Sequence, residues 1–224
     1  DPEMSRGLGD VYKRQAICEE WLERDKVLSG RQKDAIRQYV RMHTDKPEEL
    51  YQIYHAMIRG ENYKAETLEV LMEEGQPVIK IAGNEIRAAF EQLKDFVQKL
   101  ILLTERTLPL GSIVEVDIRE LKLETEKPVS SIKAVIVDRF MKKETEKQYV
   151  PYCGIIYPFG DSKKQLFFTE QAIHTVIHYG YTDRQEDAYV ALIKREIIKK
   201  GYSSYSFAEA EDDKIRMLQS DINL

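Results

Sequence analysis

The feature that most constrains the fold is a change in the spacing of apolar residues at Leu108. Over residues 16–106 apolar side chains recur mainly at helical spacing, whereas after Leu108 they alternate as they do in β-strands. Pro109 and Gly111 stand at the change, and both residue types interrupt regular structure. The sequence therefore predicts a helical region over 16–106, followed by a small α+β domain over 107–201.

The helical region is predicted to contain successive amphipathic helices separated by Gly30, Gly60 and Gly75. Val78–Ile81 is predicted to be a short extended segment, and the last helix is predicted from about Asn84 to Arg106. We interpret that helix as the core of a bundle, with a docking face for a partner helix as the alternative. The apolar stripes are Ile17, Trp21 and Leu28; Ala35, Ile36, Tyr39 and Val40; Leu50, Ile53, Tyr54, Met57 and Ile58; Leu68, Leu71 and Met72; and Ile86, Phe90, Leu93, Val97 and Leu100.

The second region is predicted to form a small antiparallel sheet. Its strands are expected to begin at Ile113 and to include Ala134–Val137, Tyr149–Tyr157 and Leu166–Phe168, with polar connections between them. Thr169–His178 is predicted to be a brief helix.

A last helix is predicted to cover this sheet. Thr182 and Gln185 fit a capping box, and Gly201 is expected to end the helix. Its predicted buried stripe is Ala188, Tyr189, Leu192, Ile193 and Ile197. The fold class is therefore α+β, a helical region followed by an antiparallel sheet with a C-terminal helix over it.

The two ends of the chain are expected to lie outside the folded regions. Residues 1–15 show no helical or strand period, and Gly9–Gln15 looks like the translated sequencing-adaptor tag found at the ends of metagenome-derived reading frames. We expect 1–15 to be such an artefact or disordered, with the true N-terminus missing. Residues 202–224 are rich in serine and acids, and are predicted to be a flexible acidic tail.

Composition excludes several classes of function. The net charge of −5 argues against a general nucleic-acid binder, which needs a basic face. No apolar run approaches the roughly 20 residues of a membrane helix. Cys18 and Cys153 match no metal or disulfide spacing, so two unpaired thiols in a reducing cytosol are expected.

No catalytic motif is recognisable, so we expect a protein that is not an enzyme and that binds no cofactor or metal. The one metal-like spacing is His174 and His178, which would share a face of the predicted helix. No third ligand accompanies them, and Thr175 stands where a zinc-protease motif has glutamate. We favour a structural role for both histidines over a metal-assisted hydrolase.

A group of aromatic side chains on the predicted sheet is the candidate partner-binding site. Some of these rings are expected on its exposed face, where protein binding or packing is favoured over stacking on single-stranded nucleic acid. Lysines on adjacent turns, Lys142, Lys143, Lys147, Lys163 and Lys164, would assist the second use. The aromatic residues are Tyr149, Tyr152, Tyr157, Phe159, Phe167 and Phe168.

A distinctive order of motifs runs through Leu108–Val114, Tyr149–Gly160, Leu166–Phe168 and Ile173–Tyr181. This order, across residues 106–201, resembles that of the family of domains of unknown function numbered forty-one seventy-six. An aromatic pair at Phe167–Phe168 belongs to the pattern, whereas Thr169–Glu170 and the long Glu120–Ser130 connection depart from it. The residues that carry the motif, expected to be structural, are Leu108, Pro109, Gly111, Ser112, Tyr157, Pro158, Gly160, Gly180 and Tyr181.

This resemblance implies an accessory role in Gram-positive bacteria, where such genes often stand beside type VII secretion systems and LXG-type toxins. The implied function is a non-enzymatic, cytoplasmic chaperone or targeting factor that binds a toxin or a secretion component. An immunity protein against a cognate toxin and a nucleic-acid-binding regulator remain as alternatives.

Overall fold

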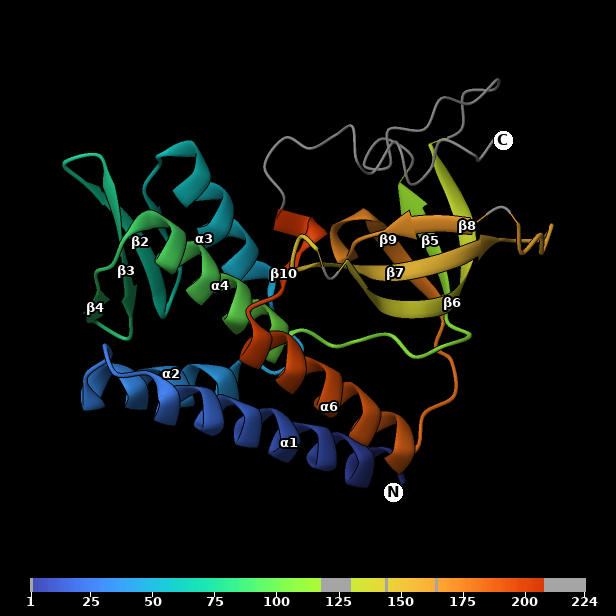
Figure 1. Cartoon of the computed structure of the whole chain (residues 1–224), viewed down its shortest axis with the longest axis horizontal. Helices are drawn as coiled ribbons and strands as arrows, with labels where there is room; N and C mark the ends of the chain where they lie inside the picture. The colour runs from blue at the N-terminus through green and yellow to red at the C-terminus, as the bar shows by residue number, and fades with distance from the viewer. Residues whose placement is uncertain (1, 118–129, 144, 164, 208–224) are drawn as a thin grey trace. The chain divides into compact units, whose positions relative to one another are not determined.

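The computed structural model describes residues 2–117, 130–143, 145–163 and 165–207, and the side chains from residue 11 onward. Its contacts divide the chain into two units. The first unit consists of Asp1–Thr107 and Asp187–Lys200, and the second consists of Leu108–Glu186 and Gly201–Leu224. Helices and antiparallel strands occur together along the chain (Figure 1), which confirms the predicted α+β class.

Helices α1 (Pro2–Arg24), α2 (Gly30–Met42), α3 (Glu48–Arg59) and α4 (Phe90–Thr104) belong to the first unit. No helix in the described part of the chain has the length and apolar character needed to span a membrane.

Local sequence explains where α2 and α3 begin and end. The Ser29 hydroxyl accepts a hydrogen bond from the Gln32 N–H, and the Gln32 side chain accepts one from the Ser29 N–H, which forms a capping box before α2. Helix α3 ends at Gly60, whose positive φ of 69° suits glycine. The predicted stripe of α2 is buried, and that of α3 is buried except for Ile58.

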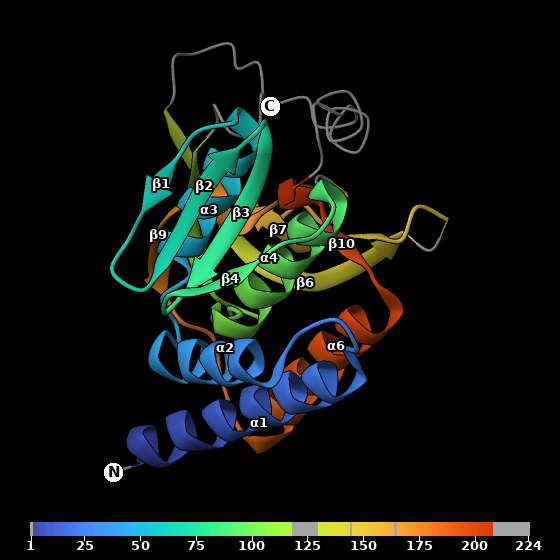
Figure 2. The same ribbon diagram turned by 90° about the vertical axis from the view of Figure 1, so that its left-hand side faces the viewer.

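A four-stranded antiparallel sheet replaces the helix predicted around Leu68–Gly75. The strands β1 (Tyr63–Lys64), β2 (Leu68–Glu73), β3 (Gln76–Ile81) and β4 (Asn84–Ile86) lie side by side in chain order (Figure 2). The extended segment predicted at Val78–Ile81 is therefore confirmed as part of β3.

Two-residue turns explain why the helix prediction was wrong. Glu74 and Gly75 connect the paired residues Glu73 and Gln76, and both turn residues have positive φ. Type I′ hairpin turns require this geometry, so Gly75 closes a hairpin instead of ending a helix. Ala82–Gly83 makes the same kind of turn before β4, which shortens the helix predicted from Asn84 to α4 alone.

The C-terminus of α4 is buried, and its last carbonyl groups have no partner within the helix. Arg14 of α1 donates to the Thr104 carbonyl at 3.0 Å, and the backbone N–H of Asp45 donates to the same oxygen at 2.7 Å. Lys194 Nζ donates to the Glu105 carbonyl at 2.6 Å. Positive side chains from distant parts of the sequence thus stabilise this helix end, where the helix dipole favours cations.

Helix α1 begins at Pro2, so it includes residues that were expected to be disordered. Arg14 lies within Gly9–Gln15, yet its side chain is buried and forms an ion pair with Asp45 at 2.8 Å. The absence of apolar residues at helical spacing over residues 1–15 was misleading, because a polar residue such as Arg14 can be buried when it caps a neighbouring helix.

Helix α6 (Arg184–Lys200) forms where a C-terminal helix was predicted, but its N-cap differs. Asp183 Oδ1 accepts hydrogen bonds from the N–H groups of Gln185 and Glu186, so Asp183 is the capping residue instead of Thr182.

The buried residues of α6 also differ from the prediction. Of the predicted stripe Ile197 is buried and Ile193 is half-buried, whereas Ala188, Tyr189 and Leu192 are exposed. The other buried residues are Val190 and Lys194. From Asp187 on, the contacts of α6 group it with the first unit, whereas we expected it to cover the sheet of the second unit. A lysine at the centre of a buried stripe could not be inferred from the spacing of apolar residues.

The second unit is built on a six-stranded sheet. Its order is β10-β7-β6-β5-β9, and β8 also pairs with β7. All pairs are antiparallel except β10 with β7. The strands are β5 (Ile113–Asp117), β6 (Ser131–Lys143), β7 (Gln148–Ile156), β8 (Gln165–Phe168), β9 (Ile173–His178) and β10 (Ser203–Ser204).

The helix predicted at Thr169–His178 is wrong. A short 3₁₀ turn, η1 (Glu170–Ala172), leads into strand β9, which pairs with β5. Ile173, Thr175, Val176 and Ile177 are β-branched, and such side chains favour a pleated strand over a helix.

The first residues of the predicted flexible tail are folded. Ser203–Ser204 pairs with β7, and a second 3₁₀ turn, η2 (Tyr205–Phe207), follows it. The rest of the predicted tail, residues 208–224, lies outside the described residues, as does nearly all of the Glu120–Ser130 connection.

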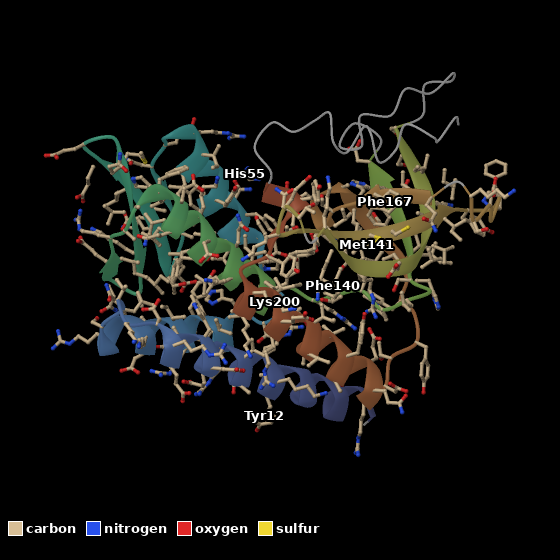
Figure 3. The ribbon with its side chains drawn as sticks, in the orientation of Figure 1. Tyr12, His55, Phe140, Met141, Phe167 and Lys200 are labelled. Atoms are coloured by element: carbon tan, nitrogen blue, oxygen red, sulfur yellow. The ribbon has the colours of Figure 1, made fainter. Side chains whose placement is uncertain are left out.

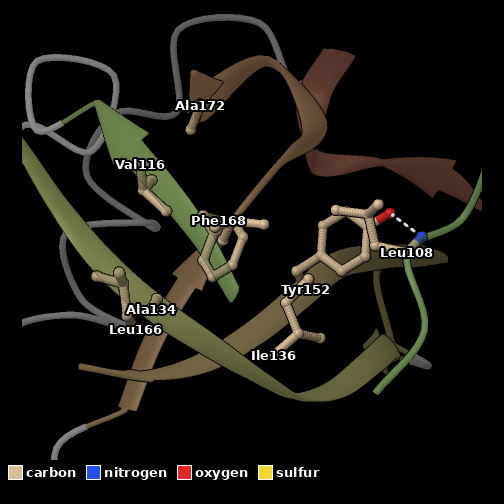
Figure 4. Close-up of a cluster of buried hydrophobic side chains, with 9 residues drawn as sticks. Leu108, Val116, Ala134, Ile136, Tyr152, Leu166, Phe168 and Ala172 are labelled. Atoms are coloured by element: carbon tan, nitrogen blue, oxygen red, sulfur yellow. Dashed lines mark hydrogen bonds between the residues drawn. The ribbon is translucent and has the colours of Figure 1, made fainter. Parts of the chain in front are cut away.

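One face of the second unit's sheet encloses a hydrophobic core (Figure 4). The Tyr152 ring stacks on Phe168 with 5.7 Å between centroids, and its hydroxyl accepts a hydrogen bond from the Leu108 N–H at 3.0 Å. The buried members of this core are Leu108, Val114, Val116, Ala134, Ile136, Tyr152, Leu166, Phe168 and Ala172.

Gly180 tests how tightly the second unit is packed. A Cβ at this position would lie 2.0 Å from the Leu110 carbonyl oxygen, so Gly180→Ala must displace backbone. We expect it to lower the free energy of unfolding by at least about 2 kcal/mol in urea titrations followed by far-UV circular dichroism. Gly30→Ala is the control, because nothing lies within 4 Å and alanine favours a helix. Equal losses in both variants would contradict the packing argument.

Candidate functional site

The loop Leu108–Ser112 is held by buried hydrogen bonds. The Ser112 hydroxyl donates to the Pro109 carbonyl at 2.7 Å and accepts from the Gly180 N–H at 3.0 Å. Gly111 has a φ of 80°, and its N–H donates to the Ile136 carbonyl at 2.8 Å. The positive φ of Gly111, the hydrogen bonds of Ser112 and the close packing at Gly180 therefore explain these residue types.

Arg139 is a buried residue that the sequence reasoning missed. It donates through Nη1 to the Leu108 carbonyl at 3.1 Å and forms a two-point ion pair with the Glu186 carboxylate, with 3.0 Å between Nη2 and Oε2. Such paired contacts suit the planar guanidinium group. Arg139 thereby joins the first residue of the second unit to Glu186, where the chain leaves that unit.

The turn Tyr157–Gly160 projects aromatic rings into solvent. Phe159 is 80% exposed and Tyr157 is 53% exposed, and the peptide bond between Tyr157 and Pro158 is cis. Gly160 has a positive φ, and its N–H donates to the Ile156 carbonyl at 3.1 Å. The turn is thus closed by its backbone and leaves both rings available for contact. Tyr181, the last motif residue, is exposed as well.

The predicted aromatic site is only partly a surface. Tyr152 and Phe168 lie in the core, and Tyr149 is also buried, with its ring 5.9 Å from that of Phe140. Phe167 on β8 is half-buried (Figure 3). Strand β7 is buried at nearly every position, whereas Tyr157 and Phe159 lie in the turn after it. On β8 alternation applies, because the neighbours Phe167 and Phe168 point to opposite faces. Tyr157 and Phe159 remain as exposed candidates.

The face of the sheet opposite the core carries an apolar row that the sequence reasoning did not single out. Ile113 pairs with Val135, and Val135 pairs with Ile155, so these three residues lie side by side across β5, β6 and β7. Their neighbours Val114 and Ala134 point into the core, which places the row on the outward face. We call Ile113, Val135 and Ile155 the outer apolar row; all three are half-buried.

An exposed apolar residue lies beyond one side of the row, and a polar row bounds the other. Val137, at the register shift that follows Ile136 on β6, is exposed. On the other side Lys133 pairs with Glu115, which pairs in turn with Thr175. Tyr157, just past the end of β7, donates its N–H to the Lys133 carbonyl at 2.9 Å and so lies beside this polar row. An apolar patch with a polar border is the usual composition of a protein-binding surface.

His174 and His178 lie on strand β9 instead of a helix, and both are exposed. The pairing of β9 with β5 shifts register twice, so the strand that carries these histidines is paired irregularly. The described residues contain no group of three or more His, Cys, Asp or Glu side chains that could hold a metal ion.

Two of the lysines expected to assist nucleic-acid stacking are engaged within the second unit. Lys143 forms an ion pair with Glu146, and the Lys142 ammonium lies 5.6 Å from the centroid of the Tyr202 ring. Lys164 lies outside the described residues.

These features define a small α+β domain with a glycine-and-serine entry loop, an aromatic turn and an outward apolar row. Residues 107–189 match the family model described as Domain of unknown function (DUF4176). The resemblance inferred from the motifs is therefore confirmed over that part of the chain. Searches of curated proteins and of solved structures found no match.

The two cysteines provide a test of burial in solution. Burial is the main cause that raises the pKa of Cys18 to about 12 and that of Cys153 to about 11. At pH 8 we expect both thiols to react with Ellman's reagent at least about 100-fold more slowly than in urea, because the thiolate is the reactive form.

The same pKa shifts predict a loss of stability at alkaline pH. The neutral thiols stabilise the fold fully below the unfolded-state pKa of about 8.5, and this contribution declines as the pH rises towards 11. Rapid reaction of both thiols in the folded protein at pH 8 would contradict their burial.

Proposed function

We propose that this chain is a non-enzymatic, cytoplasmic accessory factor that binds another protein. On the basis of the chain's resemblance to the DUF4176 family, we propose that the partner is an LXG-type toxin or a component of the type VII secretion system that exports it. The chain acts as a chaperone or targeting factor for that partner. The observation that carries the proposal is the outer apolar row, Ile113, Val135 and Ile155, on the sheet face opposite the core.

Physical chemistry supports a protein partner for this surface. The row consists of rigid β-branched side chains, which lose little conformational entropy when a partner covers them. The half-exposed Tyr157 lies beside the polar border, where its N–H donates to the Lys133 carbonyl, and aromatic residues are enriched at binding hot spots. The polar border of Lys133 and Glu115 would set orientation more than affinity.

Co-expression with a toxin gene from the same locus tests this proposal. We expect the toxin to co-purify with the wild-type chain, and Val135→Lys to reduce the recovered toxin at least tenfold, because an unpaired lysine would be buried at the contact. Val135→Lys should keep the far-UV circular dichroism spectrum of the wild type, since the substitution lies on the outward face.

Thr175→Lys is the matched control. It adds the same charge to the same face, but it lies beside Glu115 in the polar row. Toxin recovery with this variant should match the wild type. Failure of the wild-type chain to co-purify with any toxin or secretion component would refute the proposal, and so would equal loss in both variants.

Survival of cells that co-express the active toxin separates the main alternative. An immunity protein would use a protein-binding face too, but it would rescue cells that express the active toxin. A chaperone or targeting factor raises the amount of toxin that is stable or exported and leaves its toxicity unchanged.

A further inference from the structure

The segment Tyr202–Phe207, which we call the strap, returns to the second unit after α6. Its strand β10 pairs in parallel with the start of β7, Ser203 opposite Gln148 and Ser204 opposite Tyr149. The Ser203 N–H donates to the Lys147 carbonyl at 2.9 Å. A pairing of only two residues provides few backbone hydrogen bonds, so side chains must supply much of the attachment.

Two tyrosines anchor the strap. Both Tyr202 and Tyr205 are buried. The Lys142 ammonium lies 5.6 Å from the Tyr202 ring centroid, a cation–π contact, and the Tyr205 hydroxyl donates to Glu146 Oε2 at 3.3 Å. Burial and the nearby Glu146 carboxylate raise the pKa of Tyr205, so the ring remains a neutral donor. Each aromatic anchor thus combines a buried ring with a charged neighbour from the sheet.

Serine hydroxyls complete the contacts of the strap. The Ser206 hydroxyl donates to Glu170 Oε2 at 3.0 Å, and the Ser206 N–H donates to Ser204 Oγ at 3.1 Å. The receiving residues come from β6, from the turn before β7 and from η1. We call this set the strap groove: Lys142, Glu146, Lys147 and Glu170.

We propose that the strap groove is a peptide-binding site that the chain's own strap occupies as an internal ligand. A partner's extended segment displaces the strap when it carries two aromatic residues three positions apart with small hydroxyl residues between them. The strap itself is the template for this ligand, with Tyr202 and Tyr205 separated by Ser203 and Ser204. Recognition combines strand addition over two residues at the β7 edge with contacts to the aromatic side chain on each side of that short strand.

This site is separate from the outer apolar row, and it goes beyond the proposed function. None of its residues belongs to that row, and the ligand is an extended peptide instead of an apolar surface. A tethered strap has a high effective concentration at the groove, of the order of millimolar for a short connection. An external peptide is therefore expected to bind only weakly until the strap is loosened.

A fluorescein-labelled peptide, Gly-Tyr-Ser-Ser-Tyr-Ser-Phe, tests the site by fluorescence anisotropy with the full chain. We expect the double variant Tyr202→Ala, Tyr205→Ala to bind this peptide at least tenfold more tightly than the wild type, because its own strap no longer fills the groove. A control peptide with alanine in place of both tyrosines should not bind. Adding Glu146→Ala to the double variant should weaken binding, since it removes the acceptor for the second tyrosine.

Ser203→Pro provides an independent variant in case the double variant loses its fold. Proline removes the N–H that donates to Lys147, while both tyrosines stay in place. We expect peptide binding tighter than in the wild type, by a smaller factor. The proposal is overturned if neither folded variant binds more tightly than the wild type, or if the control peptide binds equally. These titrations contain no toxin, so their failure leaves the proposed function standing, and the reverse also holds.

Discussion

The Ser112 hydroxyl joins the chain entering the sheet of the second unit to the chain leaving it. It donates to the Pro109 carbonyl and accepts from the Gly180 N–H, and no side chain at Gly180 blocks the approach. Arg139 adds a second connection, from the Leu108 carbonyl to the Glu186 carboxylate. Because these polar groups are largely removed from water, losing one partner would leave the other unsatisfied at considerable cost. These contacts connect the two ends of the second unit's segment Leu108–Glu186, so its strands present surfaces of fixed geometry.

Two such surfaces differ in the chemistry that they offer. The outer apolar row displays β-branched side chains on a sheet face and would be covered by another folded surface. The strap groove lies at a strand edge, where backbone carbonyls, two carboxylates and a lysine surround buried tyrosine rings. A face recognises shape and apolar area, whereas an edge recognises an extended backbone. The two proposals therefore assign a folded surface and a peptide segment to separate places on one small domain.

Local patterns predicted much of the fold where local forces dominate. The apolar stripe of α2 and the end of α3 at Gly60 follow from spacing and capping, as does the presence of α6. Prediction was wrong where one sequence signal is compatible with two local structures. Gly75 ends a helix in one context and completes a hairpin turn in another, and only the pairing of Glu73 with Gln76 distinguishes them. Exposure of the aromatic residues was predicted only in part, since residue type does not show that β7 is buried at nearly every position or that Tyr157 and Phe159 lie in the turn after it. The outer apolar row became recognisable only once strand register was known.

The sequence by itself determined the α+β class, the change of pattern at Leu108 and the motif residues that identify the domain over 107–189. These depend on composition and on contacts between residues close in the chain. Only the tertiary structure decided that Arg139 binds Glu186 and that Lys194 and Arg14 cap α4. It alone brought Tyr202 and Tyr205 against β7 and its turn. Charged and aromatic side chains gain these roles from partners tens of residues away, and the burial that makes such contacts strong exists only after the chain has folded.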